Sequence, residues 1–253
     1  ITVVPDASRA LVDRLIEAFW PGPLTLVLPR RDTVPDIVTS GLPTVAVRMS
    51  VHPVFREVLE RFGKPLAAPS ANRFGRISPT TAEHVVKELG GRIPLVVDGN
   101  ATLHGIESTI VAVEGDTLRI LRNGPITREE LSRFAAVTDS THGSTPEAPG
   151  QMESHYAPST PLKIIEPWQA PQVEIPEGQR VGLLAWDAPV VTDRFAIQEV
   201  LSHKGDIREA ASTLFAKMRK LDEAGLDTIY VITVPPTGLG VAIMDRLRKA
   251  ETK

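Results

Sequence analysis

The sequence predicts an α/β protein with two domains, and three observations support this prediction. Short apolar runs of strand length alternate along the chain with amphipathic segments of helix length. Hydrophobic residues make up 42% of the 253 residues, which is enough for a sizeable core. Many of the 22 prolines fall between residues 144 and 189. We therefore expect a domain at 1–137, a linker at 138–161 that is rich in Ser, Thr, Pro and Gly, and a domain at 162–253.

Composition excludes several classes of function. The net charge of −3 gives no general attraction to nucleic acid or to a membrane surface. The chain has no cysteine, which excludes disulfides, thiolate nucleophiles and cysteine-bound zinc. It also shows no signal peptide and no apolar run long enough to cross a bilayer. We expect a soluble cytoplasmic protein without a membrane partner.

The first domain is expected to start with a helix capped by Asp6, followed by strands at 24–28 and 44–48. A second helix is predicted from Pro53 to Phe62, ended by Gly63. Its apolar side chains recur at helical spacing, which predicts a core-facing stripe. The stripe consists of Val54, Phe55, Val58, Leu59 and Phe62.

Residues 66–83 contain the clearest pattern of side chains suited to binding a ligand. Leu66–Ala68 is predicted to be a short buried strand that Pro69 ends. A polar loop with Ser70 and Ser78 follows, and a capping box from Thr80 is expected to start a helix that ends at residue 89. A polar loop at a helix N-terminus suits an anion. An ordinary strand-to-helix connection explains the same pattern.

Alternation along residues 44–48 places Thr44 and Arg48 on one strand face and two valines on the other. If the valines face the core, a hydroxyl and a guanidinium face outward together, a pair that suits a carboxylate or phosphate. A solvated strand face is the alternative. Further on, 95–97 is predicted to be a strand, and Asp98, which follows it, is more typical of a turn than of a magnesium ligand.

A hairpin is predicted from two β-rich runs, 108–113 and 117–121, joined by a loop with one glycine. Antiparallel pairing brings Ser108, at the start of the first strand, close to Arg122, just after the second. Ordinary polar strand ends are the alternative. Thr127 is expected to open another capping box, for a helix that runs to Phe134.

The second domain alternates predicted strands with helices at 206–224 and 239–250, which indicates a small, largely parallel sheet. The glycine-containing loop at 235–240 lacks the pattern of a nucleotide loop and is interpreted as structural. Within the linker, His155 and Tyr156 place aromatic polar groups where a simple tether would not need them.

Ordered landmarks over almost the whole chain resemble the YrdC/Sua5 family of threonylcarbamoyl-AMP synthases. The landmarks are Phe19-Trp20-Pro21-Gly22-Pro23-Leu24-Thr25, Val45-Ala46-Val47-Arg48, Ser70-Ala71-Asn72, Gly105-Ile106-Glu107-Ser108-Thr109-Ile110, Leu121-Arg122-Asn123-Gly124-Pro125, His155-Tyr156-Ala157-Pro158 and Gly238-Leu239-Gly240-Val241-Ala242-Ile243-Met244. The resemblance implies a YrdC-like twisted mixed sheet with flanking helices, N-terminally incomplete, and a small Rossmann-like C-terminal accessory domain. We expect the missing part to make the activity of this chain uncertain.

The resemblance implies that the chain joins L-threonine, bicarbonate and ATP into threonylcarbamoyl-adenylate, for modification of tRNA by a downstream threonylcarbamoyltransferase. It also implies Mg²⁺ bound with ATP, no metal held by the protein, and no covalent catalytic residue. It assigns ATP to Thr44, Ser70, Ser78, Arg122, Tyr156 and His155. It assigns threonine to Arg48, Ala68 and Ser108.

Two other functions share the YrdC-like domain. One is binding of double-stranded RNA or tRNA without catalysis, although the charge balance and the lack of a stacking-aromatic motif disfavour it. The other is the carbamoyltransferase of hydrogenase maturation, which carries cysteine zinc motifs that this chain lacks.

Overall fold

The computed structural model describes residues 2–140 and 155–251, which fold into two compact units. The first unit comprises Ile1–Pro69 and Glu107–Met152, and the second comprises Ser70–Ile106 and Glu153–Lys253. The two units are described separately below. In the described ranges no helix is both long and apolar enough to span a membrane.

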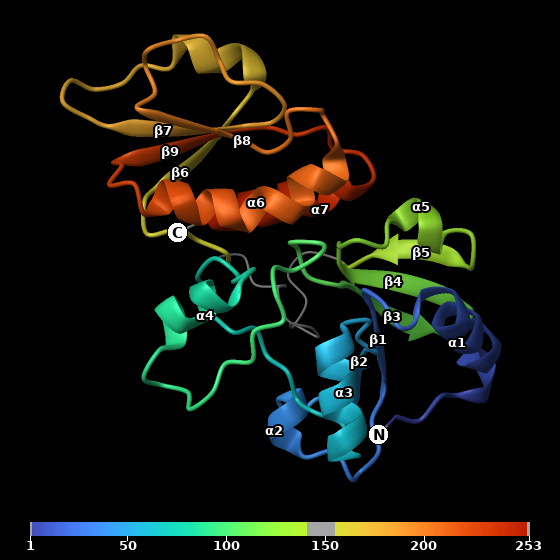
Figure 1. The fold of residues 1–253 in the computed structure, drawn as a ribbon. Coiled ribbons are helices and arrows are strands. Elements are labelled where there is room, and N and C mark those ends of the chain that lie inside the picture. Colours follow the sequence, from blue (N-terminus) through green and yellow to red (C-terminus); the bar gives the residue numbers. More distant parts are fainter. Residues whose placement is uncertain (1, 141–154, 252–253) are drawn as a thin grey trace. The chain divides into compact units, whose positions relative to one another are not determined.

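The first unit is built on a mixed five-stranded sheet in the order β2-β1-β3-β4-β5 (Figure 1). Its strands are β1 (Leu24–Pro29), β2 (Thr44–Val47), β3 (Thr109–Glu114), β4 (Thr117–Arg122) and β5 (Ala136–Asp139). β1 is antiparallel to β2 and parallel to β3, β3 and β4 form the antiparallel hairpin, and β4 is parallel to β5. The strands predicted at 24–28 and 44–48 and the hairpin are therefore confirmed.

Three helices of this unit lie around that sheet: α1 (Asp6–Phe19), α2 (Asp36–Thr39) and α5 (Arg128–Leu131). α1 packs Leu11, Val12 and Leu15 against aliphatic side chains of the strands. Its N-cap is Pro5, not Asp6 as predicted, because Asp6 already belongs to the first turn and makes no capping hydrogen bond. The capping box at Thr127 is confirmed, but α5 ends before Phe134.

Helix α3 (Pro53–Phe62) forms as predicted and ends at Gly63 in the left-handed conformation. The prediction that its apolar stripe is buried is wrong, because no residue of α3 is buried and Phe62 is 54% exposed. The predicted strands at 66–68 and 95–97 are also wrong. Residues 66–68 are exposed, and neither segment has a neighbouring strand among the described residues to satisfy its backbone N–H and C=O groups.

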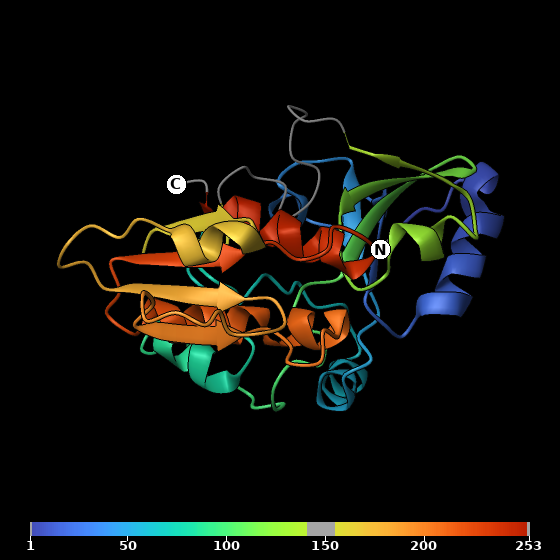
Figure 2. The same ribbon diagram turned by 90° about the horizontal axis from the view of Figure 1, so that it is seen from above.

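The second unit contains a four-stranded parallel sheet in the order β6-β9-β7-β8, and the four arrowheads point the same way in Figure 2. The strands are β6 (Leu162–Ile165), β7 (Val181–Ala185), β8 (Ile197–Val200) and β9 (Thr228–Ile232). Helices α6 (Ile207–Asp222) and α7 (Leu239–Glu251) cover one face, and the 3₁₀ helix η1 (Pro167–Gln172) lies on the other (Figure 1). The predicted parallel α/β domain is confirmed.

Helix α4 (Ala82–Leu89) and the loops around it also belong to the second unit. Ile77 and Ile106 are buried in one cluster with apolar residues of α6. The cap of α4 lies one residue later than predicted, because the Thr81 hydroxyl, not that of Thr80, accepts a hydrogen bond from the His84 amide at 3.3 Å. Glu83 therefore does not complete a capping box.

Candidate functional site

Four strands of the first unit begin or end at the same end of the sheet, and polar side chains lie there. β1 and β3 begin there, since Leu24 pairs with Thr109 in parallel register. β2 and β4 are antiparallel to them and end there. Arg48, which follows β2, Ser108, which precedes β3, and Arg122, the last residue of β4, therefore lie at the same end of one sheet.

Arg122 and Ser108 converge as the hairpin predicts. The Arg122 guanidinium donates from Nε at 3.1 Å and from Nη2 at 2.9 Å to the Ser108 carbonyl oxygen. Nη2 also lies 3.2 Å from the Ser108 hydroxyl, which in turn shares a 2.8 Å hydrogen bond with the hydroxyl of Thr25 on β1. A guanidinium and two hydroxyls are thus held together by three different strands of the sheet.

The turn after Arg122 is fixed by close backbone packing. A Cβ at Gly124 would lie 2.4 Å from the Thr109 backbone nitrogen and 2.6 Å from the Glu107 carbonyl oxygen, so only glycine fits. The Thr109 hydroxyl donates to the Ile126 carbonyl at 2.7 Å and accepts from the Ile126 amide at 2.9 Å. These contacts hold β4's end against the start of β3.

Sequence reasoning missed Thr25 and Gly124 as parts of this arrangement. Thr25 could have been recognised from the sequence, because it is the only residue with a hydroxyl in an otherwise aliphatic strand. Gly124 could not have been recognised from the sequence, because it stands next to a proline and an ordinary turn explains it as well as close backbone packing does.

Arg48 has different surroundings. Val45 is buried and Val47 packs on the core, so Thr44, Ala46 and Arg48 share the other face, as the alternation predicts. Arg48 makes no hydrogen bond or ion pair with any residue in the described ranges. The residue reaches solvent, but desolvation by the protein around it lowers the pKa of its guanidinium. An arginine stays charged in proteins, so Arg48 offers a cation to an external anion.

Thr44 is not brought to Arg122. It starts β2 opposite Pro29, at the other end of that strand from Arg48. The three residue steps of β2 separate the two ends by about 10 Å. The sheet therefore groups Arg48 with Arg122 and Ser108 and leaves Thr44 apart.

The second unit holds the remaining residues that are assigned to ATP. Ser70 is exposed, and Ser78 is only 6% exposed. Tyr156 is 1% exposed and stacks on Phe215 of α6 with ring centroids 5.5 Å apart, while the His155 amide donates to the Lys249 carbonyl at 3.1 Å. Ala68 is exposed and belongs to the first unit. The linker residues 141–154 lie outside the described residues.

Acidic side chains do not gather into a metal site in the described ranges, where no group of three or more His, Asp or Glu residues lies close enough to hold an ion. The Asp98 carboxylate accepts a hydrogen bond from the Asn100 amide at 2.8 Å. A hydrogen bond from the amide two residues further on to an aspartate side chain is the pattern of an Asx turn.

Comparisons with known proteins agree along the whole chain. A family model of Sua5, YciO and YrdC, described as telomere recombination, matches residues 3–124. A second model, described as the C-terminal domain of threonylcarbamoyl-AMP synthase, matches residues 126–251.

Similar proteins are named threonylcarbamoyl-AMP synthase, and the similar structures are named Sua5. Threonylcarbamoyl-AMP synthase of Pyrococcus abyssi is 36% identical over 98% of this chain and 74% of its own length, and that of Bacillus subtilis is 38% identical over 97% and 73%. The crystal structure of P. abyssi Sua5 complexed with L-threonine is 35% identical and superposes with a TM-score of 0.87 over 98% of this chain and 75% of that one. These matches favour the enzyme over the RNA-binding module, and the chain belongs to the YrdC/Sua5 family as a two-domain threonylcarbamoyl-AMP synthase of the Sua5 type.

Proposed function

We propose that this chain forms threonylcarbamoyl-AMP and pyrophosphate from L-threonine, bicarbonate and ATP. The observation that carries the proposal is the pair of arginines at one sheet end, Arg48 and Arg122. Arg122 is oriented by Ser108, and Arg48 has no protein partner in the described ranges. Two cations in this setting suit two anionic substrates, the carboxylate of threonine and the triphosphate of ATP.

The reaction needs positioned reactants more than a nucleophilic side chain. The amine of threonine adds to carbon dioxide with loss of a proton, or to bicarbonate with loss of water, to give a carbamate. A carbamate oxygen then attacks the α-phosphorus of ATP, and the bond to the β-phosphate oxygen breaks as pyrophosphate leaves. Charge moves onto the pyrophosphate, so fixed cationic and hydroxyl donors stabilise the transition state.

The residue roles follow from the resemblance, and the geometry supports those of Arg48, Ser108 and Arg122. Arg48 and Ser108 bind the carboxylate and hydroxyl of threonine, and the resemblance assigns the Ala68 backbone to the same substrate. Arg122 binds ATP. The remaining nucleotide contacts are assigned to Thr44, Ser70, Ser78, His155 and Tyr156.

Mg²⁺ enters this reaction with ATP, bound to its phosphate oxygens. That arrangement requires no cluster of acidic side chains. The product is a reactive mixed anhydride, which a separate threonylcarbamoyltransferase consumes by transfer to tRNA. Water hydrolyses such anhydrides, so exclusion of water from the site protects the product.

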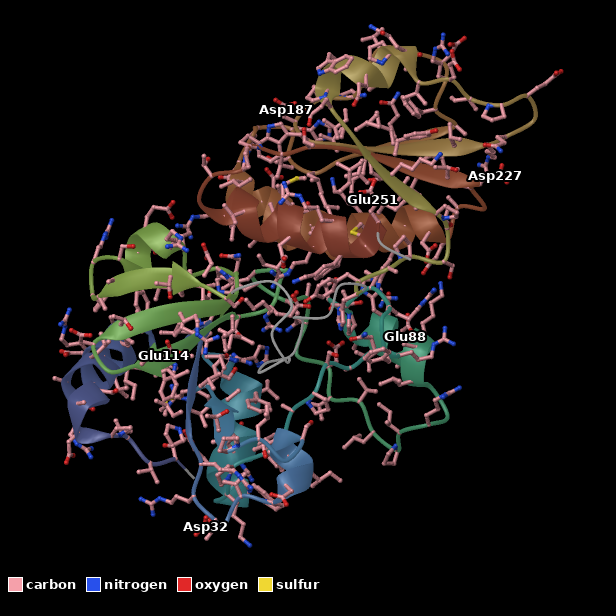
Figure 3. The ribbon with its side chains drawn as sticks, turned by 180° about the vertical axis from the view of Figure 1, so that it is seen from behind. Asp32, Glu88, Glu114, Asp187, Asp227 and Glu251 are labelled. Carbon is pink, nitrogen blue, oxygen red and sulfur yellow. The ribbon has the colours of Figure 1, made fainter. Side chains whose placement is uncertain are left out.

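The test is threonine-dependent release of pyrophosphate from MgATP and bicarbonate, with L-serine in parallel. Arg122→Ala should raise KM for ATP and lower kcat/KM by about 100-fold, the loss expected for one or two charge-assisted hydrogen bonds. Arg119→Ala is the matched control, since Arg119 lies on the same strand and its ion pair with Glu114, labelled in Figure 3, is 2.7 Å long. Unchanged ATP kinetics in folded Arg122→Ala would reject the nucleotide role of Arg122.

A further inference from the structure

One arginine of the C-terminal domain is buried against a segment of the catalytic domain within the second unit. Arg219 of α6 is 5% exposed. Its Nη1 lies 3.1 Å from the carboxylate of Glu88 on α4. Its Nε donates to the Ser78 carbonyl at 3.4 Å and its Nη2 donates to the Ile77 carbonyl. Each of the three nitrogens of the Arg219 guanidinium therefore contacts a residue of the segment 77–88.

The partners of Arg219 compensate for the burial of its charge. A buried guanidinium is stable only when its donors are satisfied and its charge is balanced. Glu88, labelled on α4 in Figure 3, has a side chain that is 8% exposed and supplies the balancing charge. Burial alone would raise the pKa of Glu88, but hydrogen bonds from Arg73 and Arg219 outweigh it and the pKa is lowered. Glu88 therefore stays ionised beside Arg219.

Further contacts hold the loop at residues 73–78, one to α4, one to α6 and one to Ala157. Arg73 pairs with Glu88 at 3.1 Å, and Arg76 pairs with Asp222 of α6 at 3.6 Å. The Ala157 amide donates to the Gly75 carbonyl at 2.8 Å. Arg219 is the most buried of the charged side chains in this set, so its hydrogen bonds are the least screened by water.

The geometry of the peptide bond connects Arg219 to the orientation of Ser78. In a trans peptide the C=O of one residue and the N–H of the next point in opposite directions. Because the Ile77 carbonyl points at Arg219, the Ser78 amide points away from it. The second hydrogen bond, to the Ser78 carbonyl, fixes the following peptide group as well. Two consecutive peptide groups that flank the Ser78 side chain are thus set by one guanidinium.

We propose that Arg219 is a positioning residue for the ATP site, through which helix α6 of the C-terminal domain holds the Ser78 loop in its binding conformation. The proposal rests on the proposed function, because Ser78 is assigned there to ATP. Arg219 itself does not touch the nucleotide. The C-terminal domain therefore contributes to ATP affinity although it supplies no group to the reaction through this residue.

The experiment uses the full chain and compares Arg219→Met, Arg219→Lys, Glu88→Gln and the control Arg208→Met. Arg208 lies exposed on the same helix α6, and its side chain makes no hydrogen bond or ion pair within the described residues. For each variant we would measure the Kd of MgATP by calorimetry without threonine, KM for each substrate, kcat, and the thermal midpoint.

Arg219→Met should raise the Kd and KM for ATP by about tenfold, because two loop carbonyls lose charge-assisted hydrogen bonds. KM for threonine should change by less than about threefold. Arg219→Lys should recover part of the ATP affinity, since an ammonium keeps the charge but lacks the fork that reaches three acceptors. Arg208→Met should behave like the parent.

Two outcomes would overturn the proposal. One is parent-like ATP affinity in folded Arg219→Met, and the other is equal weakening of both substrates in proportion to lost thermal stability, which marks a purely structural role. If Arg219→Met does not unfold cooperatively, the test of the proposal rests on Arg219→Lys and Glu88→Gln. Parent-like ATP affinity in both of these variants rejects the proposal. Failure of the proposed function is recognised separately, because the parent chain then shows no threonine-dependent release of pyrophosphate.

Discussion

Arg122 binds Ser108 through both the backbone and the side chain of that serine. The guanidinium bonds the Ser108 carbonyl from two nitrogens, at 3.1 and 2.9 Å, and approaches the Ser108 hydroxyl at 3.2 Å. A planar fork engaged at several points has little rotational freedom. The orientation of Arg122 on β4 is therefore set by Ser108, the residue just before the neighbouring strand β3.

The hydroxyl pair Thr25 and Ser108 should contribute to stability through their 2.8 Å hydrogen bond. Thr25→Val and Ser108→Ala should each lower the free energy of unfolding by about 1 kcal/mol, the net value of a partly buried hydrogen bond. The double variant should lose less than the sum of the two, with a coupling energy of about 1 kcal/mol in urea titrations. Strict additivity would contradict this contact.

Gly124→Ala should be among the most damaging small substitutions in the chain. The new Cβ would lie 2.4 to 2.7 Å from three backbone atoms of 107–109, and none of these can move without distorting β3. We expect a loss of about 3 kcal/mol in unfolding free energy and a matching loss of activity. Gly115→Asn is the control, because nothing lies within 4 Å of a Cβ there and asparagine tolerates its φ of 63°. Similar stability of the two variants would contradict the prediction.

Arg48→Ala should separate function from stability. Since Arg48 makes no hydrogen bond or ion pair with the described part of the chain, its removal should change the unfolding free energy by less than about 0.5 kcal/mol. KM for L-threonine should rise by about tenfold or more if its carboxylate loses a charge-assisted partner. Arg56→Ala, on the neighbouring helix α3, serves as control. A large drop in thermal midpoint, with KM for threonine unchanged, would assign Arg48 to structure.

His84 should make stability depend on pH. Desolvation and the nearby charge of Arg219 lower the pKa of His84, and Lys87 lowers it slightly further. The carboxylates of Glu223 and Glu83 raise this pKa, but the net shift is downward. The ring Nδ1 accepts the Thr80 amide at 3.2 Å, which requires an unprotonated Nδ1.

Because the unfolded chain takes up this proton at a higher pH than the folded one, the stabilisation is complete above about pH 6.5 and declines as the pH falls below it. His84→Asn keeps an acceptor that does not titrate, so its unfolding free energy should fall less between about pH 7.5 and 5.5 in urea titrations. Exposed His203→Asn should follow the parent. An identical decline in all three proteins would remove His84 as the cause.

Local rules predicted much of the fold. The β-rich runs at 108–113 and 117–121 with a glycine between them form the hairpin, the capping residue Thr127 starts α5, and the helix predicted at 206–224 forms as α6. β8 was missed because its two central residues, Gln198 and Glu199, are polar, so its four residues lack an apolar run. Even the convergence of Ser108 with Arg122 followed from strand pairing.

The sequence by itself determined the two-domain α/β class, the family, and the parity that puts Thr44 and Arg48 on one strand face, because each depends on spacing along the chain. Tertiary structure decided which of those residues meet. Leu66–Ala68 has the composition of a buried strand but lies exposed, since a strand forms only where another strand accepts its hydrogen bonds. Likewise Arg219 occupies an ordinary position on an amphipathic helix, and only the packing of residues 77–88 against α6 gives its buried charge three partners.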